Sequence, residues 1–297
     1  MKILIIGSKG FIGSHCFKHF TKSGFDVWGC DILDLVEPNY ICLQSISNNF
    51  NQLFSDYQFD YCINASGSAH VNYSFQFPEK DFELNVSLVI NLLGAFKNNN
   101  PECKFINFSS AAVYGNPVSL PISEDAITQP LSPYGYHKLL SEKLLSEYSR
   151  FFGLKTCSLR VFSAFGEGLK KQLFWDLYQK SRAGNSITLF GNGNESRDFI
   201  YIADLIHLVE IIINKAPFAG EVYNLANGEE ITIKRAVSVF FHELGWTGEI
   251  NYSGEIKQGD PLNWRADIRK IKELGYKQQH SFEEGIKNYC SWLKGIE

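Results

Sequence analysis

Residues 2–13 read KILIIGSKGFIG, an apolar run followed at once by a glycine at every third position. The run predicts a buried strand over Lys2–Ile6, and Phe11–Ser23 has the spacing of a helix. In such a strand–turn–helix the first glycine permits a tight turn, the second lets a phosphate approach the backbone, and the third lets helix and strand pack closely. The free N–H groups that begin the helix favour an anion. The residues expected to bind a dinucleotide pyrophosphate are Gly7, Gly10, Phe11, Ile12 and Gly13.

An acidic residue follows the second predicted strand, Asp26–Cys30. Asp31 stands about 20 residues beyond the glycine loop, where a carboxylate accepts a hydrogen bond from the adenosine ribose of NAD. We expect Ile32, the next residue, to contact the same cofactor. Lys9 favours NADP, because a cation beside the loop attracts a 2′-phosphate, although Asp31 would repel that phosphate. NAD is therefore the expected cofactor and NADP the less favoured alternative.

Short apolar runs alternate with longer helical patterns through the first half of the chain. Three further strands are expected at Tyr61–Asn64, Lys104–Ser109 and Thr156–Val161, and two long helices at Asp81–Asn98 and Tyr134–Phe152. Alternation of this kind indicates a parallel sheet with helices on both faces. With the glycine loop after the first strand, the expected fold class is α/β, a doubly wound parallel sheet of the Rossmann type.

The alternation is lost after Val161, where a stretch rich in glycine and asparagine begins. A helix at Ala203–Asn214 and a strand at Val222–Leu225 then resume the first pattern. The expected division is a dinucleotide-binding domain of residues 1–165, to which 199–227 return, and a smaller, interleaved C-terminal α/β substrate domain of residues 166–198 and 228–297.

Composition and charge exclude several classes of protein. Hydrophobic residues make up 44% and charged residues 20%, which is ordinary for a globular protein. Because 28 Lys and Arg stand against 32 Asp and Glu, no basic excess exists to neutralise a nucleic-acid backbone. No apolar run approaches the ~20 residues that span a membrane. The seven cysteines are scattered, without a C-x-x-C pair, so we expect reduced, buried thiols, no metal site and a cytoplasmic protein.

Three polar residues form a candidate catalytic group. Tyr134 and Lys138 are four apart on a predicted helix, so phenol and ammonium share one face, where the cation is expected to lower the tyrosine pKa from ~10 toward the working pH. Ser110 directly follows the predicted strand Lys104–Ser109, at the edge of the sheet where a substrate hydroxyl could be oriented. A surface pair and a turn serine are the alternatives for residues taken singly.

Together these segments resemble the extended short-chain dehydrogenase/reductase family, in its nucleotide-sugar epimerase/dehydratase branch. Similar stretches occur along nearly the whole chain, at 64–67, 81–86, 160–162 and 197–204. The resemblance implies NAD and hydride transfer at C4 of a nucleotide-diphosphate sugar. It further implies that Tyr134 is the base, Lys138 its electrostatic helper and Ser110 the hydroxyl partner.

The resemblance also implies binding residues. Those that would contact the cofactor, besides Tyr134 and Lys138, are Ala65, Ser66, Gly67, Asn85 and Phe162. Those that would contact the substrate are Ser110, Ser163, Arg197, Lys257 and Asp260. Arg197 and Lys257 would clamp the diphosphate, with a surface charge as the alternative for each. Lys257 stands where the family more often has Arg, and Ser163 stands where it usually has Asn.

Ala111 and Ala112 occupy the positions where dehydratases of this family carry an acid pair. Without those carboxylates, elimination and decarboxylation lack proton carriers. We therefore expect a C4 epimerase, with a net C4 dehydrogenase or 4-ketosugar reductase as the alternative and a non-catalytic dinucleotide sensor as the least favoured. An apolar outer stripe on the helices Asp81–Asn98 and Tyr134–Phe152 would indicate a homodimer, whereas a polar one would not, and the sequence leaves both open.

Overall fold

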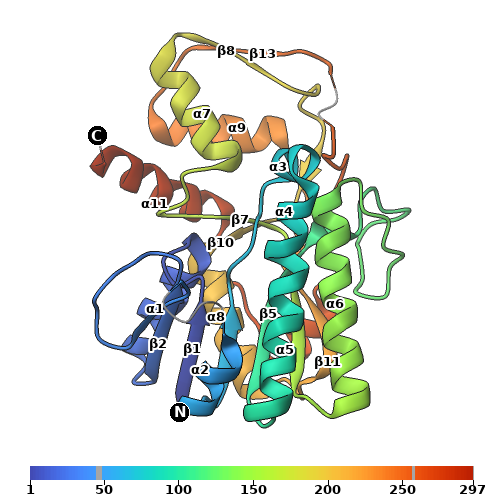
Figure 1. Cartoon of the computed structure of the whole chain (residues 1–297). Helices are drawn as coiled ribbons and strands as arrows, with labels where there is room; N and C mark the ends of the chain where they lie inside the picture. The colour runs from blue at the N-terminus through green and yellow to red at the C-terminus, as the bar shows by residue number, and fades with distance from the viewer. Residues whose placement is uncertain (45–48, 256–257, 297) are drawn as a thin grey trace.

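The computed structural model describes residues 1–44, 49–255 and 258–296. Within them a seven-stranded parallel sheet has the strand order β11-β6-β5-β4-β1-β2-β3 (Figure 1). Its strands are β1 (Lys2–Ile6), β2 (Asp26–Asp31), β3 (Tyr40–Cys42), β4 (Tyr61–Asn64), β5 (Lys104–Ser110), β6 (Thr156–Val161) and β11 (Ala219–Leu225). The expected Rossmann-type fold class is confirmed. The strand order reverses between β1 and β4, so a crevice for a ligand is expected at their carboxyl ends.

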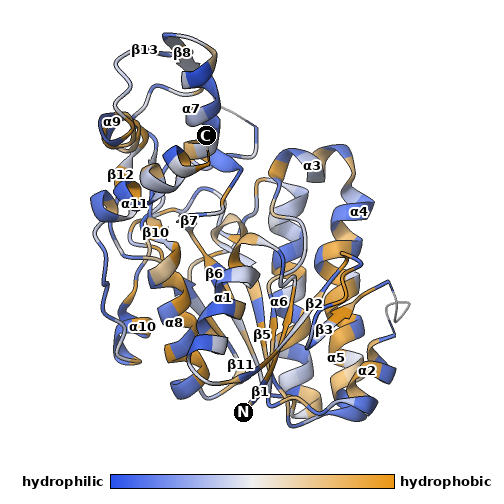
Figure 2. Cartoon of the chain, turned by 90° about the vertical axis from the view of Figure 1, so that its left-hand side faces the viewer, coloured by the Kyte–Doolittle hydropathy of each residue, from blue (hydrophilic) through white to orange (hydrophobic). Residues whose placement is uncertain are grey.

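Alternate residues of β1 point into two different apolar cores. Ile3 and Ile5 belong to the core that also holds α1 and α8, and Leu4 and Ile6 belong to the one that holds α2, α5 and α6. The helices are α1 (Phe11–Lys22), α8 (Ile202–Lys215), α2 (Phe50–Asp56), α5 (Leu88–Asn99) and α6 (Pro133–Phe152). Figure 2 shows the apolar residues concentrated on this sheet and on α5 and α8 beside it. A strand covered on both faces is apolar at successive positions, as β1 is from Ile3 to Ile6.

A smaller lobe lies beyond the carboxyl ends of the strands (Figure 1). It contains α7 (Gln172–Ala183), β8 (Ser186–Leu189), α9 (Ile233–Leu244), β13 (Glu249–Tyr252) and α11 (Phe282–Gly295). Two short sheets pair β7 (Ser163–Phe165) with β10 (Phe199–Tyr201), and β9 (Ser196–Arg197) with β12 (Ile231–Thr232). The small lobe therefore draws on segments before and after β11. The domain boundaries themselves stay a prediction.

The expected helix Asp81–Asn98 is divided in the structure. After α3 (Val71–Gln76), α4 (Pro78–Phe82) passes into a π-helical turn, Glu83–Ser87, before α5 begins. In that turn the Leu88 N–H donates to the Glu83 carbonyl, one residue further back than in an α-helix. The wider turn changes the direction of Asn85, whose buried amide faces Gly67. Hydrophobic spacing alone does not indicate such a turn.

Buried polar contacts connect the two lobes. The Asp198 carboxylate, which is fully buried, accepts hydrogen bonds from the backbone N–H groups of Asn227, Gly228 and Ala266 at 2.9–3.0 Å. α10 (Arg269–Glu273) packs on β11 close by. All seven cysteines are buried, as expected, and none forms a disulfide within the described residues. No helix in the described part of the chain is long and apolar enough to cross a membrane.

Candidate active site

The glycine loop connects β1 to α1 in the geometry that the sequence predicts. Gly7 has φ +79°, and a Cβ at this position would lie 2.7 Å from the Ser66 backbone nitrogen. A Cβ on Gly13 would collide with the Gly7 carbonyl oxygen. Within the described residues no side chain caps the N-terminus of α1, where Gly10 is the N-cap. The N–H groups of the first helical turn are therefore open to an anion, as a dinucleotide pyrophosphate requires.

Asp31 lies beside this loop at the end of β2. Its carboxylate accepts hydrogen bonds from the backbone N–H of Lys9 at 2.8 Å and of Ile32 at 2.7 Å, and the Ile32 side chain is 63% exposed. The Lys9 ammonium forms an ion pair with Glu37 at 2.6 Å. The cation that favoured NADP is thus already paired with a carboxylate, and the surroundings of Asp31 suit an uncharged ribose hydroxyl.

The end of β4 provides a second place where a cofactor fits. Gly67 has φ +107°, and a Cβ there would come within 2.6 Å of the Asn85 side-chain oxygen. Asn85 donates from its amide nitrogen to the Asp81 carbonyl at 3.1 Å, whereas its buried oxygen has no hydrogen-bond partner among the described residues. An unused acceptor beside a residue without a side chain suits a donor on a bound ligand. Ala65 and Ser66 belong to the same turn, and the Ser66 hydroxyl donates to Asn64.

The three candidate catalytic residues come together at the carboxyl edge of β5. α6 begins at Pro133 after the N-cap Ser132, whose hydroxyl accepts from the Gly135 N–H at 3.2 Å. Tyr134 and Ser110 are hydrogen-bonded through their side chains. The Lys138 ammonium donates to the Phe108 carbonyl at 2.9 Å and lies 5.9 Å from the centre of the Tyr134 ring. Phenol, hydroxyl and ammonium therefore form one group.

The pKa values in this group depend mainly on burial. Burial raises the pKa of Tyr134 to about 12, the Ser110 hydrogen bond opposes this, and the negative charge of Asp81 adds to it. In the chain alone the pKa of Tyr134 is thus raised and not lowered toward the working pH, and the electrostatic help expected from Lys138 stays a prediction. Burial lowers the pKa of Lys138 to about 8, against the opposing charges of Asp81 and Glu142. The desolvation of two groups buried together exceeds the effect of their spacing.

Two acidic residues that the sequence analysis did not assign lie near Lys138. Glu142, one helical turn beyond Lys138, pairs with Arg160 at 2.7 Å and accepts from the Ser109 hydroxyl. Asp81, on α4, accepts from the His137 ring at 2.6 Å. The four-residue spacing from Lys138 was a signal for Glu142, whereas nothing in the sequence couples Asp81 to His137.

Arg197 and Asp260 lie together on the small-lobe side. The Arg197 guanidinium covers the Trp264 ring at 5.6 Å, donates to the Ser196 carbonyl at 2.8 Å, and reaches Asp260 at 4.0 Å. The backbone N–H of Ser163 donates to the Asp198 carbonyl, next to Arg197 in the chain. Phe162 is buried against Tyr114 and Trp264. Lys257 lies outside the described residues.

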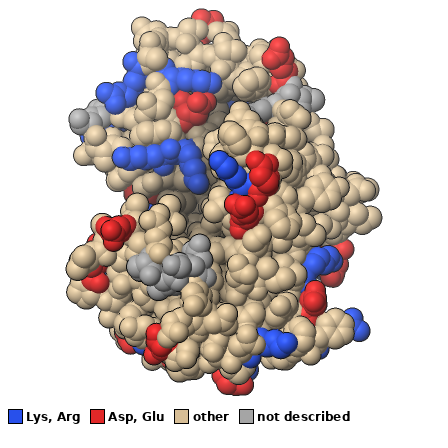
Figure 3. Space-filling view, in the orientation of Figure 1, with Lys and Arg blue, Asp and Glu red and all other residues tan. Residues whose placement is uncertain are grey.

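The surface is hollowed between the two lobes, and Lys and Arg side chains gather on its small-lobe rim (Figure 3). Lys171, which precedes α7, lies close enough to Lys138 for its positive charge to lower the Lys138 pKa further. Burial lowers the pKa of Lys171 itself. The next residue, Gln172, has φ +66°, a strained conformation for a side chain of this size. A positive rim of this kind suits an anionic substrate.

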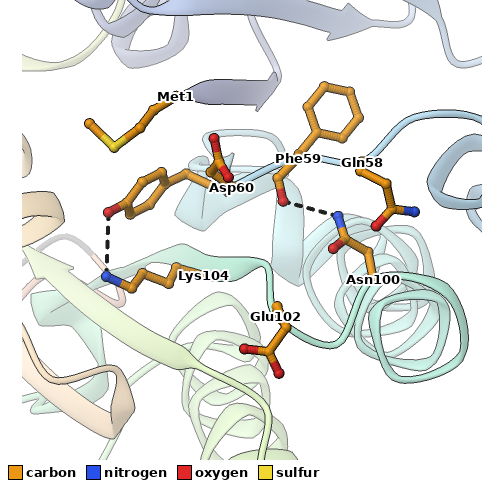
Figure 4. A pocket seen from close by; sticks show the side chains of 8 residues that line it. Met1, Gln58, Phe59, Asp60, Asn100, Glu102 and Lys104 are labelled. Atoms are coloured by element: carbon orange, nitrogen blue, oxygen red, sulfur yellow. Dashed lines mark hydrogen bonds between the residues drawn. The ribbon is translucent and has the colours of Figure 1, made fainter.

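A separate pocket of about 390 Å³ lies at the opposite edge of the sheet, at the amino ends of β4 and β5 (Figure 4). There the Lys104 ammonium donates to the Tyr61 hydroxyl at 3.3 Å, and Asn100 donates to the Phe59 carbonyl at 3.0 Å. Ligands of open α/β sheets bind at the carboxyl ends of the strands. This pocket is therefore not the dinucleotide site.

Comparisons with known proteins agree with this geometry. The sequence profile of the NAD dependent epimerase/dehydratase family matches residues 3–226. A putative UDP-glucose 4-epimerase of Methanocaldococcus jannaschii is 28% identical over 98% of both chains. The solved UDP-glucuronic acid 4-epimerase of Bacillus cereus, in complex with UDP-glucuronic acid and NAD, is 28% identical over 100% of both chains, with a TM-score of 0.90.

The UDP-glucose 4-epimerase of Thermotoga maritima, solved with UDP-glucose, has the same TM-score of 0.90 at 26% identity and covers 100% of this chain and 99% of its own. These similarities extend over both lobes, and the profile match includes the glycine loop, Ser110, Tyr134 and Lys138. NAD is accordingly the cofactor for which the site is built. By its sequence, fold and site, the chain belongs to the NAD dependent epimerase/dehydratase family.

Proposed function

We propose that this enzyme is a nucleotide-sugar 4-epimerase. The observation that carries the proposal is the group formed by Ser110, Tyr134 and Lys138, which lies at the same carboxyl edge of the sheet as the glycine loop. The relatives reported above, which carry the names of UDP-sugar 4-epimerases, support the same reaction.

The proposed roles follow from the contacts. The phenolate of Tyr134 accepts the C4 hydroxyl proton as C4 is oxidised to a ketone, and the phenol returns a proton when C4 is reduced on its other face. Ser110, bonded to Tyr134, orients that hydroxyl. The Lys138 ammonium stabilises the phenolate. NAD, when bound, supplies the hydride acceptor and then the hydride donor. No external oxidant or reductant is consumed.

The other site residues are proposed to bind the two nucleotides. Arg197, whose guanidinium is held on Trp264, would bind the substrate diphosphate, since its planar fork suits phosphate oxygens. Asp260 and Ser163 would complete the substrate side. The residues proposed to hold NAD are Gly7, Gly10, Phe11, Ile12, Gly13, Asp31, Ile32, Ala65, Ser66, Gly67, Asn85 and Phe162.

A net C4 dehydrogenase or 4-ketosugar reductase uses the same Ser110, Tyr134 and Lys138, so it is the second candidate. Ser163 favours this second candidate, because the family usually has an asparagine at this position of the substrate side. The alanines at 111, which is buried, and 112, which is half-buried, provide no acid or base for dehydration. The complete catalytic group argues against a sensor without activity.

The positive charge of Lys171 suggests which sugars to test. Its ammonium lies near Lys138, where it suits a sugar that carries a carboxylate. A panel of UDP-glucuronic acid, UDP-glucose, UDP-N-acetylglucosamine and the corresponding GDP-, CDP- and dTDP-sugars therefore includes charged and neutral members. A preference for the acidic sugar would support a contact with Lys171.

The deciding experiment incubates the purified enzyme with this panel in deuterated water, without added cofactor, while NMR follows C4. An epimerase returns its own hydride, so we expect a C4 epimer with no deuterium at C4. The matched control is Tyr134→Phe, which should form none within the same time. If no sugar gives an epimer and a ketosugar or NADH accumulates instead, the net oxidoreductase replaces the epimerase.

We further propose that two copies of the chain pair through α5 and α6. An apolar groove of about 410 Å³ runs along this face, lined by Phe82, Val86, Ser87, Ile90, Leu140, Lys143, Leu144 and Glu147. Phe82, Ile90 and Leu140 are 39–44% exposed. In a two-fold contact the Lys143 of one copy can meet the Glu147 of the other. The outer stripe of these helices is thus apolar. Of the two alternatives that the sequence leaves open, this favours the homodimer.

Sedimentation velocity at micromolar concentration should give twice the mass of one chain. Ile90→Glu should reduce it to one chain, because a charge would be buried in the groove. Val118→Glu, at an exposed apolar residue outside the groove, is the control and should leave the dimer intact. A wild-type protein that sediments as a single chain would contradict the proposal.

A further inference from the structure

A buried acid–imidazole pair lies behind the catalytic group. The Asp81 side chain is fully buried, and one carboxylate oxygen lies 2.6 Å from Nδ1 of His137, whose side chain is 12% exposed. The second carboxylate oxygen has no hydrogen-bond partner among the described residues. Because a carboxylate can only accept, Nδ1 of His137 carries the proton and donates it to this bond. The pair joins α4 to α6.

The helical spacing places this pair against the catalytic dyad. His137 directly precedes Lys138 on α6, and Tyr134 is one turn earlier. The charge of Asp81 acts on both: it favours the ammonium of Lys138 and opposes ionisation of Tyr134. A hydrogen bond that merely joined two helices would not require a charged group at this place, since two neutral partners cost less to bury.

Other charged and polar groups act on the same residues from neighbouring elements. Glu142 on α6 reinforces the effect of Asp81 on Lys138, and Lys171, before α7, opposes it. From β5 the Phe108 carbonyl accepts from the Lys138 ammonium, and Ser110 bonds to Tyr134. On the outer side the Phe82 ring meets the His137 ring edge-on at 5.4 Å. Of the two acidic residues of α4, Glu79 and Asp81, it is Asp81 whose charge acts on Tyr134 and Lys138.

We propose that Asp81 and His137 form a positioning pair for the Tyr134–Lys138 dyad. His137 holds the Asp81 carboxylate in place, and this carboxylate keeps the buried Lys138 ammonium protonated. The proposal rests on the proposed function in one respect, namely that the dyad is catalytic. Its test is therefore a titration of Lys138 that needs no turnover.

The protein labelled with [13Cε]-lysine is titrated by NMR between pH 6 and 10.5. Lys138 is expected to titrate near pH 8, apart from ordinary lysines at about 10.4, and its signal is assigned by its loss in Lys138→Met. Asp81→Asn keeps the shape and the hydrogen bond but removes the charge. It should lower the Lys138 midpoint by about one pH unit, at the low end of the effect of a nearby opposite charge.

Two variants of His137 separate the roles of donor and ring. His137→Leu removes the donor and should lower the Lys138 midpoint as Asp81→Asn does, because a carboxylate buried without a donor favours its protonated form. His137→Asn keeps a donor near the position of Nδ1 and should restore the wild-type midpoint. Both variants lose the contact with Phe82, so their difference reports the donor alone. Thermal unfolding confirms that each variant is folded.

In the active enzyme Asp81→Asn should also move the alkaline limb of kcat/KM to lower pH by the same amount, whereas a structural contact would change only the height of the profile. A Lys138 midpoint unchanged by Asp81→Asn overturns the proposal, even if activity falls. If the wild-type protein has no epimerase activity but the Lys138 midpoint still shifts in Asp81→Asn, the proposed function is contradicted and the positioning pair is supported. If His137→Leu does not fold, Asp81→Asn and His137→Asn still decide the question.

Discussion

Replacement of Tyr134 by phenylalanine is expected to lower kcat by about 10²–10⁴, the usual contribution of a general acid–base group. The variant removes one hydroxyl from a buried ring that keeps its packing, so the protein should fold and bind NAD as before. Single-turnover absorbance of NADH, measured with saturating sugar nucleotide, reports the oxidation step directly and separates it from binding.

Tyr136→Phe is the matched control, because this tyrosine is two residues away on the same helix but 56% exposed. It should leave kcat within a factor of two, as an exposed hydroxyl without a role in the site would. Near wild-type turnover in Tyr134→Phe would remove this residue from the mechanism and return the helix to a structural role.

Replacement of Lys138 by methionine is expected to lower kcat/KM by about 10²–10³, the loss typical when a charge that stabilises a developing anion is removed. In the wild type the pKa of Lys138 is about 8, so kcat/KM should fall as pH rises through 8 and the ammonium loses its proton. The methionine variant should lack that limb, because nothing titrates at this position.

Lys138→Arg tests the charge apart from its titration, since a guanidinium stays protonated. If the arginine fits the buried site, the alkaline limb should move above pH 8 and part of the activity should return. A wild-type profile that stays flat from pH 7 to 10 would contradict the assigned role of Lys138.

Much of the fold could be predicted because its information is local. The apolar run of β1, the glycine spacing and the acid after β2 all lie within the first 31 residues, and each follows from the geometry of one strand, turn or helix. The four-residue spacing of Tyr134 and Lys138 likewise places both on one helical face. Such features need no knowledge of what packs around them.

Other features depend on contacts between distant segments. His137 and Asp81 are 56 residues apart. Lys9 and Glu37, which form an ion pair, are separated in the sequence by α1 and β2. The direction of the Tyr134 pKa also depends on the neighbours that bury it, which spacing alone does not show. Burial is a property of the assembled layers rather than of a sequence pattern.

The π-helical turn at Glu83–Ser87 shows a third kind of limit. One extra residue in a turn leaves the hydrophobic pattern of Asp81–Asn98 almost unchanged, so a single continuous helix was the natural interpretation. The turn nevertheless determines where Asn85 lies relative to Gly67. Local geometry at a site can therefore differ from the prediction even where the element as a whole is predicted correctly.

The late position of β11 in the sequence also affects how the protein emerges from the ribosome. β6 is synthesised long before its outer neighbour, because α7, β8 and α8 are made between them. At ~5–20 residues per second, the open edge of β6 is exposed on the nascent chain for several seconds. An unpaired apolar strand edge invites pairing with other chains. Translation of this stretch is thus a period in which the edge of β6 is open to pairing with other chains.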